Sequence, residues 1–166
     1  MAVGRHTGQA AVETSMQTAR LSQVFKGVGG DAKQLTQDVL TLAAAEGRSR
    51  KEAMESAIQW ARLGLTRREV AEATRVSLLA ANVAEIDSLE ATEKLQAVQK
   101  AYGLQIRELA GVLGMLNSIS NTYNVTNSAM LEGLTRTASI ARQAGVPLAD
   151  LVGLMGATVG ATGQSG

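Results

Sequence analysis

The chain has 166 residues, of which 45% are hydrophobic and 19% are charged. This length and composition predict one folded domain with a buried core and argue against a disordered chain. The net charge of +1 supplies no field that would attract nucleic acid or an acidic substrate. Cysteine is absent, which excludes disulfide bonds, thiolate metal sites and cysteine nucleophiles.

The composition favours helices that approach one another closely. Proline occurs once, and alanine is abundant. The aromatic residues are Phe25, Trp60, Tyr102 and Tyr123, so the core must be built from alanine and aliphatic side chains. We therefore expect an all-α protein of about seven or eight short helices joined by Gly/Asn turns. The expected packing is an irregular antiparallel helical bundle or a short α-solenoid.

Residues 1–30 are expected to form an N-terminal helix followed by a glycine-rich linker. Val12 and Met16 would lie on the weakly apolar face of this helix, which needs a packing partner to be stable in water. The first residues lack the apolar segment of a signal peptide. No run of about 18 apolar residues predicts an ordinary transmembrane helix anywhere in the chain.

Four of the following helices are expected to begin at capping boxes. In a capping box the cap residue and a residue three positions later each bond to the other's backbone N–H. The pairs are Asp31 with Gln34, Ser49 with Glu52, Thr66 with Glu69, and Asp87 with Glu90. Helix ends are expected at Gly47, Gly64, Asn82 and Gly103.

A seven-residue junction recurs between these helices. A glycine ends one helix and is followed by an aliphatic residue, a cap residue, an acid three positions after the cap, and a second aliphatic residue. The copies are Gly64, Leu65, Thr66, Glu69 and Val70; Gly103, Leu104, Gln105, Glu108 and Leu109; and Gly145, Val146, Pro147, Asp150 and Leu151. A fourth copy has Asn124 in the left-handed position, then Val125 and the cap Thr126, but lacks the acid. The intervals of 39, 21 and 21 residues indicate a quasi-repeat of one helix and one turn.

The last stretch, residues 124–166, contains two expected helices. The first should place Leu131, Leu134, Ala138 and Ala141 on one face, and the second should continue that face with Leu151, Leu154 and Met155. The second helix also carries glycines at 153, 156, 160 and 163. These predict close helix packing or a flexible exit. The alternative is a small-residue face that meets another helix or a lipid bilayer.

The order of these features resembles the core region of bacteriophage tail tape measure proteins. The resemblance is carried by the turn AGVPLADL followed by LMGATVGATGQSG, and upstream by helices that end in ARLGL, AAN and YGL. It extends over roughly residues 26–166. Family members are much longer and continue past GQSG. Residues 31–166 are therefore expected to form a tape measure core-like helical domain, and the chain is expected to be a fragment of a longer one.

The resemblance implies a structural virion component that acts in tail length determination, tail assembly and DNA ejection. It implies a location in the phage tail lumen or at the tail tip, and in the host cytoplasm during assembly. We expect a homo-oligomer whose partners are tail tube and tail-tip or baseplate proteins, with transient contact with the host membrane. No specific recognition of nucleic acid is expected.

The chain lacks the usual catalytic constellations. Its single histidine, His6, stands near the N-terminus, and no phosphate-binding GxxxxGK[ST] loop is present. We therefore expect no enzymatic activity, no cofactor and no metal. Two other functions stay open. One is a helical-repeat protein-binding module, and the other is a DNA-binding helix-turn-helix over residues 65–83 with its turn at Arg75.

Overall fold

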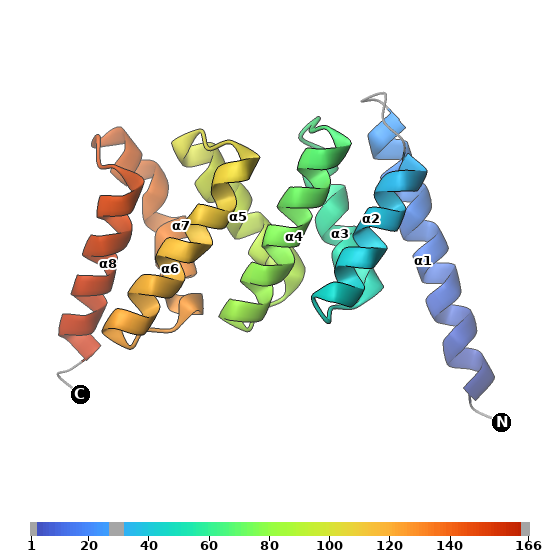
Figure 1. The fold of residues 1–166 in the computed structure, drawn as a ribbon, viewed down its shortest axis with the longest axis horizontal. Helices are drawn as coiled ribbons and strands as arrows, with labels where there is room; N and C mark the ends of the chain where they lie inside the picture. Colours follow the sequence, from blue (N-terminus) through green and yellow to red (C-terminus); the bar gives the residue numbers. More distant parts are fainter. Residues whose placement is uncertain (1–2, 27–31, 164–166) are drawn as a thin grey trace. The chain divides into compact units, whose positions relative to one another are not determined.

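The fold is that of a computed structural model, which describes residues 3–26 and 32–163 (Figure 1). Over these residues the regular secondary structure is all helical, with eight α-helices and one short 3-10 helix, so the predicted all-α class is confirmed. The helices are α1 (Val3–Lys26), α2 (Ala32–Ala45), α3 (Arg50–Ala61), α4 (Arg67–Ala84), α5 (Ser88–Tyr102), η1 (Ile106–Glu108), α6 (Leu109–Tyr123), α7 (Asn127–Gln143) and α8 (Leu148–Gly163). They form two compact units, unit 1 (Met1–Leu78) and unit 2 (Leu79–Gly166), which are described separately.

In unit 1, α3 packs against both α1 and α2, and α1 packs against α2. The core contains large side chains that are fully buried, among them Phe25, Leu35, Met54 and Trp60. Trp60 is also the point at which α3 is joined to α4, because its indole Nε1–H donates to the buried Ser77 Oγ over 2.9 Å. A buried indole N–H needs such a partner.

The face that α1 buries differs from the predicted one. Val12 and Met16 are 60% and 54% exposed, whereas Gln17, Leu21 and Phe25 are buried. The buried residues are spaced four apart, so they lie along one stripe of the helix. Gln17 is accepted in this stripe because its amide donates to Glu55 of α3 over 3.2 Å. A polar residue that finds a partner on another helix cannot be identified from apolar spacing alone.

In unit 2, helices two apart in sequence lie side by side. Helix α5 packs along α7, α6 packs along α8, and α7 also contacts both α6 and α8. Consecutive helices from α5 to α8 run in opposite directions (Figure 1). This is the arrangement of two stacked helical hairpins, which is the packing used by α-helical repeats. The predicted α7 face is confirmed, since Leu131, Leu134, Ala138 and Ala141 are all buried.

One side chain of unit 2 lies on a different face from the predicted one. The sequence pattern places Leu154 in the core, but it is 61% exposed, and Val152 is buried in its place. In α6 the buried apolar residues are Leu109, Val112 and Leu116, which follow the buried Ile106 of η1. The 3-10 turn that precedes α6 has three residues per turn, so the apolar stripe begins with spacings of three before it changes to four.

The helix-turn-helix interpretation is wrong. It requires a turn at Arg75, but Arg67 to Ala84 form one uninterrupted α-helix. Arg75 lies on the surface of this helix, where its guanidinium forms an ion pair of 2.7 Å with Glu72. The residues assigned to the start of a recognition helix, Val76 and Ser77, are buried and therefore cannot contact DNA.

We expect Ser77→Ala to lower the free energy of unfolding of unit 1 by about 1–3 kcal/mol, because it leaves the Trp60 indole N–H buried without an acceptor. Urea unfolding followed by the fluorescence of Trp60, the single tryptophan, measures this directly. Thr41→Ala on the exposed face of α2 is the control and should change stability by less than about 0.5 kcal/mol. An unchanged midpoint for Ser77→Ala would mean that this hydrogen bond adds no net stability.

Candidate functional site: the helix junctions

The turns that join α2 through to α8 share one backbone design. Each contains one residue in the left-handed region, with φ between 53° and 79°. These residues are Gly47, Gly64, Glu85, Gly103, Asn124 and Gly145. A left-handed residue ends a helix because it turns the chain away from the helix axis.

The residue after the left-handed one satisfies the end of the preceding helix. Its N–H donates to the carbonyl five residues earlier, which is the Schellman arrangement that pairs an otherwise orphan carbonyl. The bonds are Arg48 to Ala43 (2.9 Å), Ile86 to Ala81 (3.1 Å), Leu104 to Gln99 (3.0 Å), Val125 to Ser120 (3.1 Å) and Val146 to Ala141 (2.9 Å). At Gly64 the left-handed residue itself pairs a carbonyl, since its N–H donates to Ala61 over 3.1 Å, and Gly145 N–H makes the same kind of bond to Arg142 over 3.0 Å.

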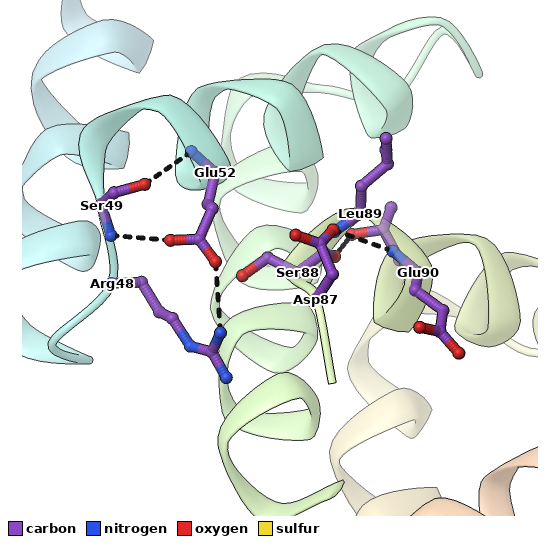
Figure 2. A network of polar contacts seen from close by, with 8 residues as sticks. Arg48, Ser49, Glu52, Asp87, Ser88, Leu89 and Glu90 are labelled. Atoms are coloured by element: carbon purple, nitrogen blue, oxygen red, sulfur yellow. Dashed lines mark hydrogen bonds and ion pairs between the residues drawn. The ribbon is translucent and has the colours of Figure 1, made fainter. Parts of the chain in front are cut away.

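The next residue caps the following helix. At Ser49 the capping box is complete, since Ser49 Oγ accepts from Glu52 N–H over 3.2 Å and the Glu52 carboxylate accepts from Ser49 N–H over 3.0 Å (Figure 2). Figure 2 also shows the cap at Asp87, whose carboxylate accepts from the N–H groups of Leu89 and Glu90 at 2.7 and 3.4 Å. Both caps satisfy backbone donors that the helix itself cannot pair.

The remaining caps follow the same logic with different side chains. The Glu69 carboxylate accepts from both the N–H and the hydroxyl of Thr66, at 2.9 and 2.7 Å, and these bonds lower the Glu69 pKa. Glu108 accepts from Gln105 N–H over 2.6 Å, and Thr126 Oγ accepts from Ala129 N–H over 3.1 Å. At the last junction Pro147 has no N–H to satisfy, and Asp150 lies in the first turn of α8. The predicted Asp31 cap lies outside the described residues.

The junctions are tied to the core by their seventh residue. This position is buried in every copy, and its occupants are Ala53, Val70, Ala91, Leu109, Met130 and Leu151. The second position is half-buried in every copy. Each junction therefore sets both where a helix begins and which residue of its first turn enters the core.

Glu85 is the junction residue that sequence reasoning missed. The predicted helix end at Asn82 is wrong, because α4 continues to Ala84 and Glu85 takes the left-handed conformation with φ of 55°. Glu85 divides the 39-residue interval from Gly64 to Gly103 into 21 and 18 residues. The long first interval of the quasi-repeat is therefore two repeats of ordinary length. The signal was available: the cap Asp87 and the acid Glu90 stand at junction offsets, and counting back two residues from the cap gives Glu85.

The structure brings some of the predicted junctions together. In unit 2 the turns at Gly103 and Gly145 lie at the same end of the helices, where the Tyr102 hydroxyl donates to the Val146 carbonyl over 3.2 Å (Figure 1). Burial raises the pKa of this tyrosine. The Asn124 turn lies at the opposite end of unit 2 (Figure 1). The Gly64 junction belongs to unit 1.

Helices α5 and α7 are joined by charged side chains at their middle. The Lys94 ammonium forms ion pairs with Glu132 of α7 and, at 3.4 Å, with Glu90 of its own helix. Glu132 also pairs with Arg136 at 2.7 Å. The hydrogen bond from Lys94 lowers the pKa of Glu132, and the bond to Glu132 raises the pKa of Lys94, so both groups stay charged near neutral pH.

Of the predicted small-residue positions on α8, only Gly156 is shown to be packed closely. A Cβ atom at Gly156 would lie 2.1 Å from Ile119 Cγ2 and 2.9 Å from Tyr123 Cδ2, both on α6. A Cβ atom at Gly153 would meet no atom within 4 Å. The surroundings of Gly160 and Gly163 lie outside the described residues. Close helix packing is therefore the role of Gly156.

The described part of the chain offers no cluster of metal ligands. There, no three histidine, aspartate or glutamate side chains lie close enough together to hold a metal ion. None of the helices described is both long and apolar enough to cross a membrane. The side chain of His6 lies outside the described residues.

Comparison with known proteins identifies one family. The family model described as phage-related minor tail protein matches residues 31–166, which covers all the junctions. No solved structure matches the chain.

We expect Glu85→Gly to raise the free energy of unfolding of unit 2 by about 0.5–1 kcal/mol, because a left-handed conformation strains a side chain that has a Cβ. Gly103→Ala should lower it by about 1 kcal/mol for the same reason, since its Cβ would meet no neighbouring atom. Thermal unfolding followed by circular dichroism measures both. Gly111→Ala, in open space inside α6, is the control and should be stabilising. The two variants should change the free energy of unfolding in opposite directions. Changes in the same direction would contradict a left-handed residue at both junctions.

We expect Gly156→Ala to destabilise unit 2 by about 1–3 kcal/mol, because the added methyl group forces α6 and α8 apart. Gly153→Ala is the matched control on the same helix and should be neutral or stabilising by up to about 1 kcal/mol. Hydrogen exchange of the α6 and α8 amides distinguishes local separation of these helices from global unfolding. Equal protection in the two variants would show that the contact at Gly156 carries no stability.

Proposed function

Because the chain belongs to the family of phage-related minor tail proteins, we propose that it is the core segment of a tail tape measure protein. The family membership makes it a structural component of a phage tail. The tape measure assignment is the finer step, and it includes roles in tail length determination, tail assembly and DNA ejection. The proposed role is structural rather than enzymatic.

The observation that carries the proposal is the run of six junctions within the matched region. Their order, from Gly47 to Gly145, follows the order of helix ends by which the sequence resembles tape measure cores. A single glycine-capped helix is common in proteins and carries little information. The same cap geometry repeated at intervals of 17 to 21 residues is far more specific.

The local structure suggests which part of the task this segment performs. A ruler for tail length needs an extended helix, since an α-helix rises 1.5 Å per residue. The longest described helix, α1, has 24 residues and spans only about 36 Å. We propose that this segment is an end module that docks to tail-tip, baseplate or tube proteins, or to other copies of itself, instead of measuring length directly.

Features of the core support a module that repacks during ejection. Buried alanines occupy many of the contact positions between helices. In unit 1 the Thr74 hydroxyl and the Gln17 carbonyl oxygen are buried without a hydrogen-bond partner among the described groups. Each such group reduces the stability of the packed state. Transient contact with the host membrane is part of the same proposal, with α8 as its candidate, since this helix carries no charged residue after Asp150.

A helical-repeat protein-binding module with no part in setting tail length is the second candidate. It is favoured by the side-by-side packing of α5 with α7 and of α6 with α8. The two candidates differ in what happens to tail length. Loss of a tape measure core must change it, whereas loss of a binding module must leave it unchanged.

The first experiment is an in-frame deletion of codons 31–166 in the phage that encodes the chain, with electron microscopy of the particles. We expect heads with no tails or with tails of abnormal length, and rescue by the intact gene. Tails of normal length that lack density at the tip would keep the structural tail role but reject the tape measure role. Normal, infectious particles would reject both.

The docking role has its own test. Sedimentation of the purified 166-residue chain, alone and mixed with the tube and tail-tip proteins of the same phage, should show self-association or complex formation. A monomer that binds neither protein would reject the docking role.

A further inference from the structure

Unit 2 contains a groove of about 450 Å³ between α5 and α7 that no junction or core contact explains. Its lining from α5 is Ala97, Lys100 and Ala101, and its lining from α7 is Thr135, Ser139, Arg142 and Gln143. Two of these side chains are cationic and none is acidic. The groove is therefore positively charged, with a small-residue wall on one side and a polar wall on the other.

The two cations are held on neighbouring helix ends. Lys100 lies in the last turn of α5 and Arg142 in the last turn of α7. The hydrogen bond from the Tyr102 hydroxyl to the Val146 carbonyl, 3.2 Å, joins the end of α5 to the turn that follows α7. The helix macrodipole favours a cation at each of these positions. Because α5 and α7 lie side by side and run in the same direction, their last turns are adjacent and both cations line the same groove.

Another cation on the same pair of helices, Lys94, is neutralised by acids of the chain itself. Lys94 stands earlier on α5, and it is neutralised by Glu132 from α7 and Glu90 from its own helix. Lys100 and Arg142 form no ion pair within 4 Å among the described residues. Near the middle of α5 and α7 the positive charge is therefore neutralised by acids, whereas near their C-terminal ends it is not.

The polar wall supplies hydrogen bonds that suit an anionic group. Gln143 Nε2 donates to Ser139 Oγ over 3.3 Å, which leaves the Ser139 hydroxyl hydrogen available as a donor. The Arg142 guanidinium can bind a carboxylate through two parallel N–H donors, and Lys100 adds a point charge. The small side chains of Ala97 and Ala101 let the backbone or stem of a partner approach α5.

We propose that the groove between α5 and α7 binds a carboxylate-bearing segment of a partner polypeptide, with Lys100 and Arg142 as the charge anchors and Ser139 as a hydrogen-bond donor. Charge complementarity selects an acidic peptide. Nucleic acid is disfavoured, because tight binding to a phosphate backbone needs many cations and this groove provides two. The proposal does not depend on the tape measure assignment, because it requires only a protein partner with exposed glutamates.

The test uses the full chain and a blocked helical peptide with glutamates four residues apart in an alanine and glutamine background. A peptide with glutamine in place of every glutamate is the reference ligand, and a single-stranded DNA oligonucleotide tests the nucleic-acid outcome. Binding is measured by fluorescence anisotropy at low salt, where screening is weakest. We expect the glutamate peptide to bind about tenfold more tightly than the glutamine peptide.

The variant Lys100→Gln with Arg142→Gln should abolish that preference. The charge-matched control is Arg50→Gln with Arg107→Gln, which removes two exposed arginines outside the groove and should keep the preference within about twofold. Arg142→Lys should retain part of it, because it keeps the charge but loses the paired donors. Circular dichroism of each variant establishes that it is folded.

Three results would overturn the proposal. They are equal binding of the glutamate and glutamine peptides, equal loss in the groove variant and its control, and preferential binding of the oligonucleotide that depends on Lys100 and Arg142. Should the double variant fail to fold, amide chemical-shift changes in the intact chain decide the matter. On addition of the glutamate peptide they should map to residues 97–101 and 135–143, and changes confined to other residues would reject the site.

Discussion

The left-handed residue at each of the six junctions between α2 and α8 is the constraint on which the rest of the structure depends. It ends the helix, lets the next N–H bond back to an orphan carbonyl, and places the cap of the following helix two residues later. Few residues are then needed to reverse the chain. The buried seventh position of each junction couples this local geometry to the core, from Ala53 in the first copy to Leu151 in the last.

Closely packed helices follow from the short turns and the scarcity of aromatic side chains. Phe25 and Trp60 are fully buried, and alanine fills many of the other contact positions. Where even alanine is too large, at Gly156, the backbone of α8 lies directly against Ile119 and Tyr123 of α6. The core therefore combines large aliphatic and aromatic side chains with alanines, and at Gly156 the backbone of α8 meets side chains of α6 directly.

Charged side chains distinguish the middle of the α5 and α7 pair from its C-terminal end. Lys94 is satisfied within the protein by Glu132 and Glu90, whereas Lys100 and Arg142 line a groove without an acid. A structural tail protein works through its contacts with other proteins. A groove with unbalanced charge is where those contacts would gain most from electrostatic complementarity. The family membership shows a phage tail protein, and this groove is the place where we propose that a partner segment binds.

The sequence by itself determined the helical class, the left-handed positions at Gly64, Gly103, Asn124 and Gly145, and the caps at Ser49, Asp87 and Thr126. These features depend on interactions within a few residues, so local residue types suffice to predict them. Only the tertiary structure decided that Gln17 is buried and Leu154 exposed, and that Gly156 rather than Gly153 meets another helix. Each of these depends on which helix lies opposite, and that partner is brought into contact by packing between residues far apart in the chain.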